Sequence, residues 1–289
     1  MKKQSVRPAS QHRFRQWGLC ISVALPAILL GWWLVWSNCA LEITPITVPV
    51  KGLPASFEGL KIAHVSDLHA RRFGKEQADL LDAIAQEKPD LIAVTGDIID
   101  AETKDFTPVK EFVEGALKIA PVYYVMGNHE PDNPAYPELF EYLQSAGVVL
   151  LFDTYEVLAR DGETLTLMGL SDRKLPSVQD EAEMLRRLRA LSEETEGCKI
   201  LFSHRPELIE SVYAGKANLV LAGHAHGGQI RLPWIGGLYA PGQGLFPQYT
   251  AGLYTVEDTP MVVSRGLGLP YPRINNRPQV LILTLAADD

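Results

Sequence analysis

The stretch Leu91-Ile-Ala-Val-Thr-Gly-Asp-Ile-Ile-Asp100 joins an apolar run to a short polar loop. Apolar and β-branched residues that are closed by glycine and aspartate are typical of a buried strand ending in a loop. In an open α/β sheet, ligands collect at the carboxyl ends of the strands. The carboxylates of Asp97 and Asp100 are therefore predicted to lie at a binding edge of the sheet.

Four further stretches repeat this pattern along the chain. In each of them, an apolar run is followed by polar side chains of the kind that bind metal ions. The runs cover residues 62–65, 122–126, 199–202 and 219–222, and the polar stretches after them are Asp67-Leu-His69, Gly127-Asn-His-Glu130, Ser203-His204 and Gly223-His-Ala-His226. Five strands would deliver Asp, His and Asn side chains to one rim.

This set of side chains suits the hydrolysis of phosphate esters by two metal ions. Two divalent ions roughly 3.5–4 Å apart make hydroxide available at neutral pH and neutralise the phosphoryl oxygens of an anionic substrate. Neutral imidazoles together with carboxylate and amide oxygens suit manganese, iron or zinc, and we expect manganese first. None of the three cysteines belongs to these stretches, which argues against a structural zinc site.

In these residues the chain resembles the calcineurin-like metallophosphoesterases, whose pattern is D-x-H, G-D-x-x-D, G-N-H-E, H and G-H-x-H in this order. The resemblance runs from about residue 61 to residue 286. It implies an α/β fold, a four-layer αββα sandwich of two mixed β-sheets flanked by helices. The metal ligands that it implies are Asp67, His69 and His226 for a first ion, Asn128, His204 and His224 for a second, and Asp97 as a bridge between the two.

The resemblance also implies catalytic roles outside the ligand set. His129 would be the general acid that protonates the leaving oxygen, and Asp100 would orient it. Glu130 is expected to orient a metal ligand rather than to bind metal itself. His64 lies inside the first predicted strand and is expected to be a buried structural histidine, and Asp172 is a candidate neighbour of the site.

The run GHAHGGQIRLP, residues 223–233, is similar to a signature of small membrane-anchored bacterial phosphoesterases. That branch includes one form of UDP-2,3-diacylglucosamine hydrolase of lipid A synthesis. The stretch Ser264-Arg-Gly-Leu-Gly268 also fits this branch. The chain departs from the branch at Ala225, where threonine is usual, and at Gln279, where glutamate is usual. Neither position is a ligand in the family pattern, so the implied metal site is unaffected.

The segment from Trp17 to Trp36 carries no charged side chain and has the length of one bilayer span. Tryptophans stand at both of its ends, as expected for the two membrane interfaces. Residues 1–16 contain five basic residues and no acidic residue, so the positive-inside rule places this tail in the cytoplasm. We therefore expect a single-pass transmembrane anchor over residues 17–36 in the inner (plasma) membrane, with an extracytoplasmic catalytic domain.

A cleaved signal peptide is the alternative for this segment. The apolar stretch is longer than a usual signal core, and residues 37–40 form a poor cleavage site, so we expect the anchor to be retained. A linker over residues 37–60 and one metallophosphoesterase domain over residues 61–289 are predicted to follow. Roughly 240 residues are enough for one large α/β domain with a full core.

Local patterns predict the remaining elements of the domain. Apolar spacing predicts helices over residues 76–87, 137–146, 183–191 and 207–213. A hairpin over residues 155–170, with its turn at Arg160-Asp-Gly162, and strands over residues 252–256, 261–264 and 280–285 are also predicted. Strands that alternate with helices in the first half, followed mostly by strands, indicate two sheets flanked by helices.

Charge and composition narrow the class of substrate. The formal net charge of −8 and the lack of a basic stripe argue against a nucleic-acid-binding protein. Arginine binds phosphate in a bidentate manner, so Arg231, Arg265 and Arg273 are predicted to bind the substrate, with ordinary surface arginines as the alternative. Residues 232–249 are rich in glycine and proline yet strongly apolar, which indicates either a binding or membrane surface or packing over the sheet edge.

Together these features predict a membrane-anchored phosphoesterase that uses two metal ions. Its substrate would be a phosphodiester, diphosphate or phosphomonoester, preferably lipid-linked, attacked directly by a metal-bridging hydroxide. A UDP-2,3-diacylglucosamine hydrolase is the sharper alternative, although that nucleotide is cytoplasmic and the tail predicts an external domain. A non-catalytic binding scaffold is a remote alternative, because such relatives typically lose the general-acid histidine or several ligands.

Overall fold

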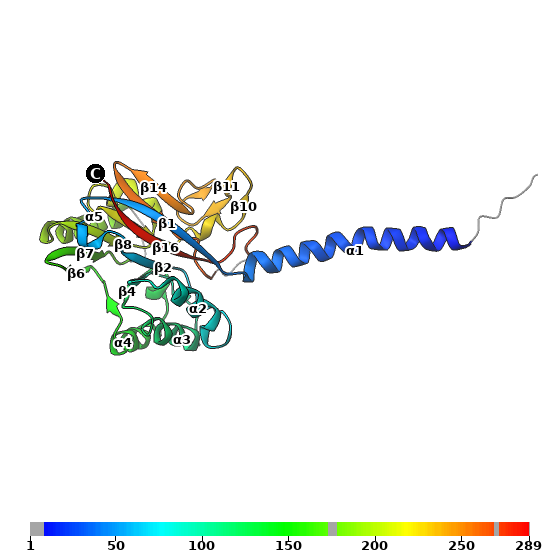
Figure 1. The fold of residues 1–289 in the computed structure, drawn as a ribbon, viewed down its shortest axis with the longest axis horizontal. Coiled ribbons are helices and arrows are strands. Elements are labelled where there is room, and N and C mark those ends of the chain that lie inside the picture. The colour runs from blue at the N-terminus through cyan, green and yellow to red at the C-terminus, as the bar shows by residue number, and fades with distance from the viewer. Residues whose placement is uncertain (1–8, 173–177, 269–271, 289) are drawn as a thin grey trace, which may run out of the picture.

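Two six-stranded β-sheets pack face to face at the centre of the domain (Figure 1). The computed structural model describes residues 9–172, 178–268 and 272–288, and for residues 9–21, 23 and 178–180 it describes the backbone only. The strands of the first sheet, in spatial order, are β1 (Glu42–Lys51), β16 (Gln279–Asp288), β2 (Lys61–Val65), β3 (Leu91–Thr95), β4 (Val122–Val125) and β5 (Val149–Leu150). The strands of the second sheet are β14 (Gly252–Val256), β15 (Thr259–Val263), β9 (Leu219–Ala222), β8 (Cys198–Phe202), β7 (Glu163–Gly169) and β6 (Thr154–Arg160).

Both sheets are mixed, as predicted. In the first sheet β2, β3, β4 and β5 run parallel, whereas β16 is antiparallel to β2. In the second sheet β15, β9, β8 and β7 run parallel, and the edge strands β14 and β6 are antiparallel to their neighbours. The β6–β7 hairpin turns at Asp161 and Gly162, which both have positive φ, as the sequence of its turn predicts.

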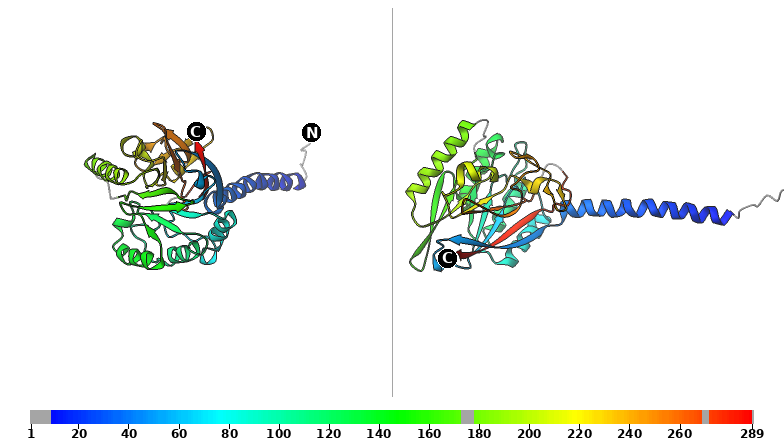
Figure 2. Two further views of the ribbon diagram at one scale, coloured as in Figure 1. Left: turned by 60° about the vertical axis from the view of Figure 1, so that its left-hand side comes forward. Right: turned by 90° about the horizontal axis from the view of Figure 1, so that it is seen from above.

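Helices cover the outer face of each sheet and complete four layers. The helices α2 (Ala78–Glu87), α3 (Thr107–Ala116) and α4 (Tyr136–Ala146) pack their buried faces on the first sheet. Helix α5 (Val178–Glu194) and the short π-helix η5 (Ile209–Tyr213) pack on the second. The left view of Figure 2 shows the cyan and green helices α2–α4 on one side of the strands and the yellow-green α5 on the other. The predicted αββα sandwich is therefore confirmed.

The predicted linker over residues 37–60 is wrong in its central part. Residues 42–51 form strand β1, which pairs in parallel with β16 from Glu42 opposite Gln279 to Lys51 opposite Asp288. Val48 and Val50 are fully buried between the sheets. Strand β1 tolerates two prolines because it lies at the edge of the sheet, where the missing N–H groups remove no ladder bond. The domain thus begins about twenty residues earlier than its motifs indicate.

Helix α1 (Ala9–Cys39) leaves the domain as one long helix (Figure 1). The predicted membrane span, residues 17–36, lies within it, but the side chains of residues 17–21 and 23 lie outside the described set. Among the residues that are described, no helix is both long and apolar enough to cross a membrane.

Candidate metal centre

The carboxyl ends of β2, β3 and β4 in one sheet and of β8 and β9 in the other meet at one edge of the sandwich. Backbone hydrogen bonds join the loops that follow these strands. The amide of Asp67 donates to the carbonyl of Gly96 at 3.0 Å, and the amide of Gly223 donates to the carbonyl of His204 at 3.0 Å. Glycine is required at Gly127 because a side chain there would collide with Asp97. The strand ends are thus close enough for their side chains to share ligands.

Asp67, His69 and His226 form the first cluster of potential metal ligands. Each side chain offers one ligand atom, and the three atoms lie within 4.8 Å of one another. All three side chains are buried, and Nε2 of His226 lies 3.6 Å from Oδ1 of Asp67. The backbone amide of His224 holds the carboxylate of Asp67 in place, because it donates to both carboxylate oxygens at 3.1 and 3.2 Å.

Asp97, His204 and His224 form the second cluster, again with one ligand atom each within 4.8 Å. Nε2 of His204 lies 3.1 Å from Oδ2 of Asp97 and 3.2 Å from Nδ1 of His224. Nδ1 of His204 donates to the carbonyl oxygen of Thr95 at 2.7 Å, so Nε2 is the nitrogen that faces the other members of the cluster. The backbone contact thus fixes the ring of His204 with Nε2 toward Asp97 and His224.

Asn128 supplies an independent sign that an ion belongs beside the second cluster. Its Oδ1 is buried and has no hydrogen-bond partner among the described residues. A buried amide oxygen without a partner is costly, and a metal ion would satisfy it. Asn128 stands between Gly127 and His129, and the amide of His129 donates to Oδ1 of Asp97 at 3.0 Å. The donor set thus fits the amide ligand expected from the sequence.

The ionisation of these groups also suits metal binding. Burial lowers the pKa of His226 to about 3 and lowers that of His224 well below its usual value, so both imidazoles are neutral at pH 7. Although burial opposes it, the charge of Asp97 raises the pKa of His204 to about 10. Burial likewise opposes ionisation of Asp97, but His204 holds the pKa of that carboxyl well below its usual range. Without an ion, His204 is therefore protonated beside the anionic Asp97, and a divalent cation would take the place of that proton.

Asp100 contacts His69, and not His129 as the resemblance implies. Its Oδ1 lies 2.5 Å from Nδ1 of His69. The loops after β2 and β3 run side by side, since the amide of His69 donates to the carbonyl of Asp97 at 3.0 Å, and this pairing brings Asp100 to the histidine of the first loop. Asp100 is therefore placed to orient a potential metal ligand.

His129 lies beside both clusters without belonging to either. Its ring meets the ring of His69 edge to face, with the centroids 5.3 Å apart, and its Nε2 lies 3.9 Å from Oδ2 of Asp97. About a third of its side chain, 35 %, is exposed, whereas the side chain of Asp97 is 1 % exposed. His129 is thus the histidine of the site with access to solvent.

Glu130 and His64 are both buried next to the site, and Glu130 bonds to backbone amides rather than to the side chain of a potential ligand. Glu130 is fully buried and accepts hydrogen bonds from the amides of Ile98 at 2.7 Å and Gly127 at 2.9 Å, which ties the loops after β3 and β4 together. Burial, and then the charge of Asp97, raises the pKa of Glu130 to about 8. His64 is fully buried, and its Nε2 lies 2.8 Å from Oγ1 of Thr95.

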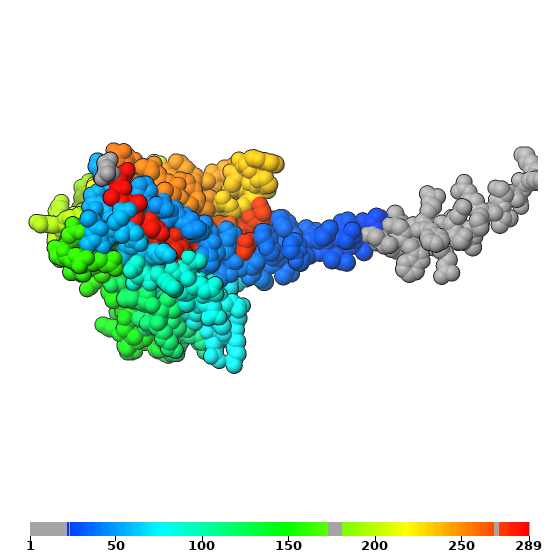
Figure 3. Space-filling view, in the orientation of Figure 1, coloured from blue at the N-terminus to red at the C-terminus, as the bar shows by residue number. Residues whose placement is uncertain are grey.

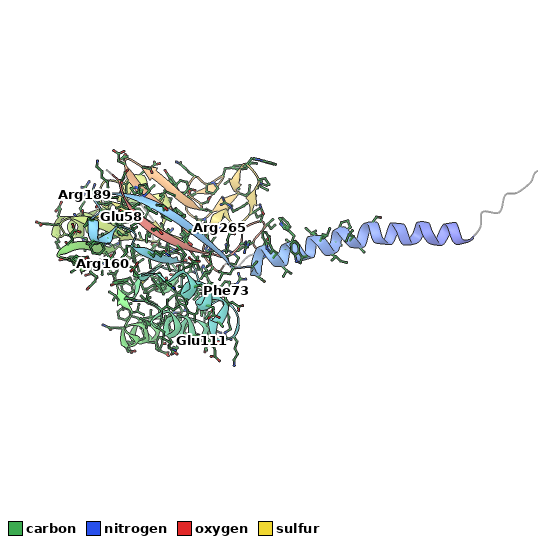
Figure 4. The ribbon with its side chains drawn as sticks, in the orientation of Figure 1. Glu58, Phe73, Glu111, Arg160, Arg189 and Arg265 are labelled. Atoms are coloured by element: carbon green, nitrogen blue, oxygen red, sulfur yellow. The ribbon has the colours of Figure 1, made fainter. Side chains whose placement is uncertain are left out.

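The three arginines predicted to bind substrate are used within the fold. Arg231 donates to the carbonyl of Gly227 at 2.8 Å and to Oγ1 of Thr250 at 3.2 Å. Arg265 pairs with Glu42 at 2.9 Å, and Figure 4 shows it on the side of the domain that carries α1.

Arg273 does not fit the predicted contact with a phosphate. It is fully buried and donates through Nη2 to the carbonyls of Arg265, Gly266 and Gly268. Burial lowers its pKa to about 9. The amide of Gly268 donates to the carbonyl of Asp67, so Arg273 braces the loop behind a potential metal ligand.

Arg205 is the site arginine that the sequence analysis missed. Its Nη1 lies 3.2 Å from Nε2 of His224, and its Nε donates to Oδ2 of Asp172 at 2.6 Å. Glu207 lies on the same side, with Oε1 3.8 Å from Nε2 of His224. The signal was the position of Arg205 directly after His204. Asp172 is confirmed as a neighbour of the site through this contact.

Comparison with known proteins agrees with this geometry. The family described as calcineurin-like phosphoesterase matches residues 60–228. Phosphodiesterase YaeI of Escherichia coli is 31 % identical over 238 residues, which are 78 % of this chain and 82 % of that protein. The uncharacterized metallophosphoesterase YkuE of Bacillus subtilis is 31 % identical over 258 residues, 85 % of each chain. A transmembrane protein with metallophosphoesterase domain of Danio rerio is 26 % identical over 88 % of this chain and 59 % of that protein.

These matches cover the loops that carry both clusters, and the clusters provide sites for two divalent ions. The chain belongs to the calcineurin-like phosphoesterase family and is a hydrolase of phosphate esters that uses two divalent metal ions.

Proposed function

We propose that this protein is a membrane-tethered phosphodiesterase that acts on a lipid-linked phosphate ester. The observation that carries the proposal is the pair of buried ligand clusters, next to a histidine that is not a ligand. The name of the relative YaeI, a phosphodiesterase, supports a diester over a diphosphate or a phosphomonoester. The aromatic segment after His226 supports a substrate that is presented by a lipid surface.

The two clusters and the unpartnered amide oxygen of Asn128 support the following assignment of ligands. Asp67, His69 and His226 would hold the first ion, and Asn128, His204 and His224 the second, with Asp97 between them. Bound divalent ions supply Lewis acidity toward the phosphoryl oxygens and a hydroxide nucleophile at neutral pH. Imidazole nitrogens with carboxylate and amide oxygens suit manganese, iron or zinc, and manganese is the ion that we propose first.

His129 completes the chemistry as the general acid. The departing oxygen of an ester needs a proton, and a protonated imidazole within reach of that oxygen supplies it. The amide of His129 is fixed by its hydrogen bond to Asp97, and its ring is steadied by edge-to-face contact with His69. Its side chain is 35 % exposed, so a bound ester could reach it.

Arg205 is the side chain most suitably placed to bind the ester phosphate. It lies beside His224 and is 15 % exposed, so its guanidinium is next to the second cluster without being sealed in the core. Its Nε is held by Asp172 and its Nη1 lies beside His224 and Glu207, which leaves Nη2 to turn toward an anion.

Helix α1 would hold the catalytic domain at the inner membrane, on its extracytoplasmic side. Exposed apolar side chains run along its described part: Leu25, Ile28, Leu29, Leu30, Trp32 and Val35. The basic tail before the helix supports a cytoplasmic amino terminus. Protease added to spheroplasts should then remove the domain, and a reporter fused after Asp289 should work only outside the cytoplasm.

A UDP-2,3-diacylglucosamine hydrolase is the second candidate, supported by the run from Gly223 to Pro233. Its substrate is cytoplasmic, so it becomes the better proposal if the spheroplast experiment leaves the domain protected. A non-catalytic scaffold is the remote candidate, and the presence of both clusters and of His129 speaks against it.

The test uses the full chain in phospholipid vesicles, loaded with manganese. It is offered a phospholipid diester, a soluble aryl diester, an aryl monoester and a nucleoside diphosphate. We expect the diesters to be hydrolysed, the lipid diester to be preferred, and a chelator to abolish both activities until metal is restored. Asp97→Asn is the inactive control. Preference for a monoester or a diphosphate would refute the proposal that the protein cleaves a phosphodiester bond. The absence of turnover with both ions bound would refute the catalytic function.

A further inference from the structure

Two small hairpins beside the metal centre carry an exposed apolar surface, the apolar platform. They are formed by β10 (Arg231–Leu232) with β11 (Gly236–Gly237) and by β12 (Tyr239–Ala240) with β13 (Gly244–Leu245). The side chains of the platform are Leu232, Trp234, Ile235, Tyr239, Leu245 and Phe246. Trp234 is fully exposed, and the other five side chains are between 37 % and 69 % exposed. Soluble surfaces rarely gather so many large apolar side chains, and such patches mark contact with a partner or a membrane.

The platform is a fixed structure and not a loose loop. The amide of Leu238 donates to the carbonyls of Gly228 at 3.1 Å and Ile230 at 2.8 Å, and the amide of Phe246 donates to the carbonyl of Leu238 at 2.9 Å. The backbones of Gly228 and Gly237 touch so closely that a side chain on either would collide with the other. The exposed side chains are thus held outward by the same backbone that follows the ligand His226.

Trp234 and Phe246 both adopt positive φ, at 64° and 54°. This left-handed conformation is unfavourable for a bulky residue that is not glycine. The fold keeps these two aromatic side chains at the turns although neither is buried by the protein. We therefore expect that a partner or a membrane covers these side chains and offsets the cost of their backbone conformation.

The platform lies next to the point where α1 leaves the domain. Strand β10 bonds to the segment 273–277 through the amide of Arg231 and the carbonyl of Ile274, at 3.0 Å. That segment bonds to the end of α1, through the amide of Asn275 to Oγ of Ser37 at 3.2 Å and the amide of Arg273 to Oδ1 of Asn38 at 2.7 Å. Figures 1 and 3 show the yellow platform on the side from which α1 projects.

The composition of the platform fits a phospholipid interface. No acidic residue occurs between Glu210 and Glu257, although the chain as a whole has a formal net charge of −8. An anionic bilayer surface repels carboxylates, so their absence here removes that repulsion. Tryptophan and tyrosine are the residues that membrane interfaces favour, and Trp36, at the end of α1, stacks under the guanidinium of Arg277 at the same junction.

We propose that the apolar platform inserts into the interface of the bilayer that receives α1, so that the domain is attached at two points. The proposal rests on the membrane tether proposed above, and it does not rest on the phosphoesterase chemistry. A helix alone would let the domain rotate about the helix axis. A second contact, on the backbone that follows His226, would fix the orientation of the metal centre relative to the membrane surface.

Site-specific fluorescence in nanodiscs tests the insertion. The full chain carries Cys20→Ser and Cys39→Ser, and Cys198 is retained because burial raises the pKa of its thiol to about 11, which suppresses alkylation at neutral pH. A polarity-sensitive label is attached to Trp234→Cys, and quenching by spin-labelled phospholipid is measured. The matched control is Val157→Cys, an apolar position that is 45 % exposed on strand β6, which lies on the side of the domain opposite α1 (Figure 1). A label at Ile28→Cys reports whether α1 itself is inserted.

We expect the label at position 234 to be shifted to the blue and quenched several-fold more than the label at position 157. Equal quenching at 234 and 157, with position 28 quenched, would overturn the platform contact while the tether stands. No quenching at position 28 would overturn the tether, and the platform contact with it. A blue shift at 234 without lipid quenching, which grows with the number of chains per disc, would assign the platform to a second copy and also overturn the proposal.

A variant of the platform tests the membrane contact separately from the phosphoesterase reaction. The pair Trp234→Ser with Phe246→Ser should leave the metal content and the hydrolysis of a soluble diester unchanged. Hydrolysis of a diester within the bilayer should fall roughly tenfold, because the orientation of the metal centre to the membrane surface is no longer fixed. An unchanged rate on the bilayer diester would contradict this consequence. A chain whose label at 234 is quenched but which hydrolyses no ester would refute the proposed function alone.

Discussion

Replacing His129 by glutamine should remove proton transfer to the leaving oxygen and spare the metal ions. The side chain of His129 belongs to neither cluster, and the contact that fixes the loop to Asp97 comes from its backbone amide, which glutamine keeps. The expected loss is therefore that of a general acid, about 10²–10⁴-fold in kcat, or about 3–5 kcal/mol of transition-state stabilisation.

The size of that loss should depend on the leaving group. Two diesters are compared, one that releases p-nitrophenolate, which needs no proton, and one that releases an alkoxide. We expect less than about tenfold loss on the first and the full loss on the second, since only the alkoxide depends on the acid. Metal content is measured on the same samples. Equal losses on both esters, or loss of one ion from the variant, would refute the reasoning that places His129 outside the ligand set.

Three further substitutions test other parts of the site. Asp97→Asn should lose bound metal and activity together, because Asp97 stands at the junction of the clusters, and two retained ions per chain would contradict its bridging role. Asp100→Asn should weaken metal binding by about 10–100-fold in a competition titration, because the carboxylate next to His69 orients that ligand; an unchanged affinity would mean that the contact is incidental. Burial lowers the pKa of His64 from 6.5 to about 3, so its contribution to stability is fully present above pH 6.5 and falls as the unfolded chain gains the proton. Wild type should lose about 2 kcal/mol of unfolding free energy through this residue between pH 8 and pH 5, and urea denaturation of His64→Gln should lack that difference.

The sequence predicted the elements whose signals are local. Strand β3 was placed at Leu91–Thr95 and strand β9 at Leu219–Ala222, and the structure has the same bounds. Both are short apolar runs that are buried on two faces and followed by glycine, so the sequence alone predicts where each strand begins and ends. The clustering of potential ligands followed from the same signal, because the ends of parallel strands share one edge.

Contacts between distant segments were beyond a local analysis. Strand β1 is separated from its partner β16 by more than two hundred residues along the chain. No local pattern in residues 42–51 predicts which strand they pair with. Helix α3 was overlooked although Val109, Phe112, Val113 and Ala116 recur at helical spacing, so in this case the signal was present. The contact of Asp100 with His69 depends on how two loops lie side by side, and a motif alone cannot give it.

The division of ligands between the sheets explains why the site resists a local reading. Asp67 and His69 follow a strand of the first sheet, whereas His226 follows a strand of the second. The second cluster is divided in the same way, with Asp97 from the first sheet and His204 from the second. Each cluster therefore exists only when the two sheets pack face to face, and that packing is made by apolar side chains far from the motifs. The motifs supply the potential metal ligands, and the apolar core between the sheets brings these ligands close enough to bind the same ion.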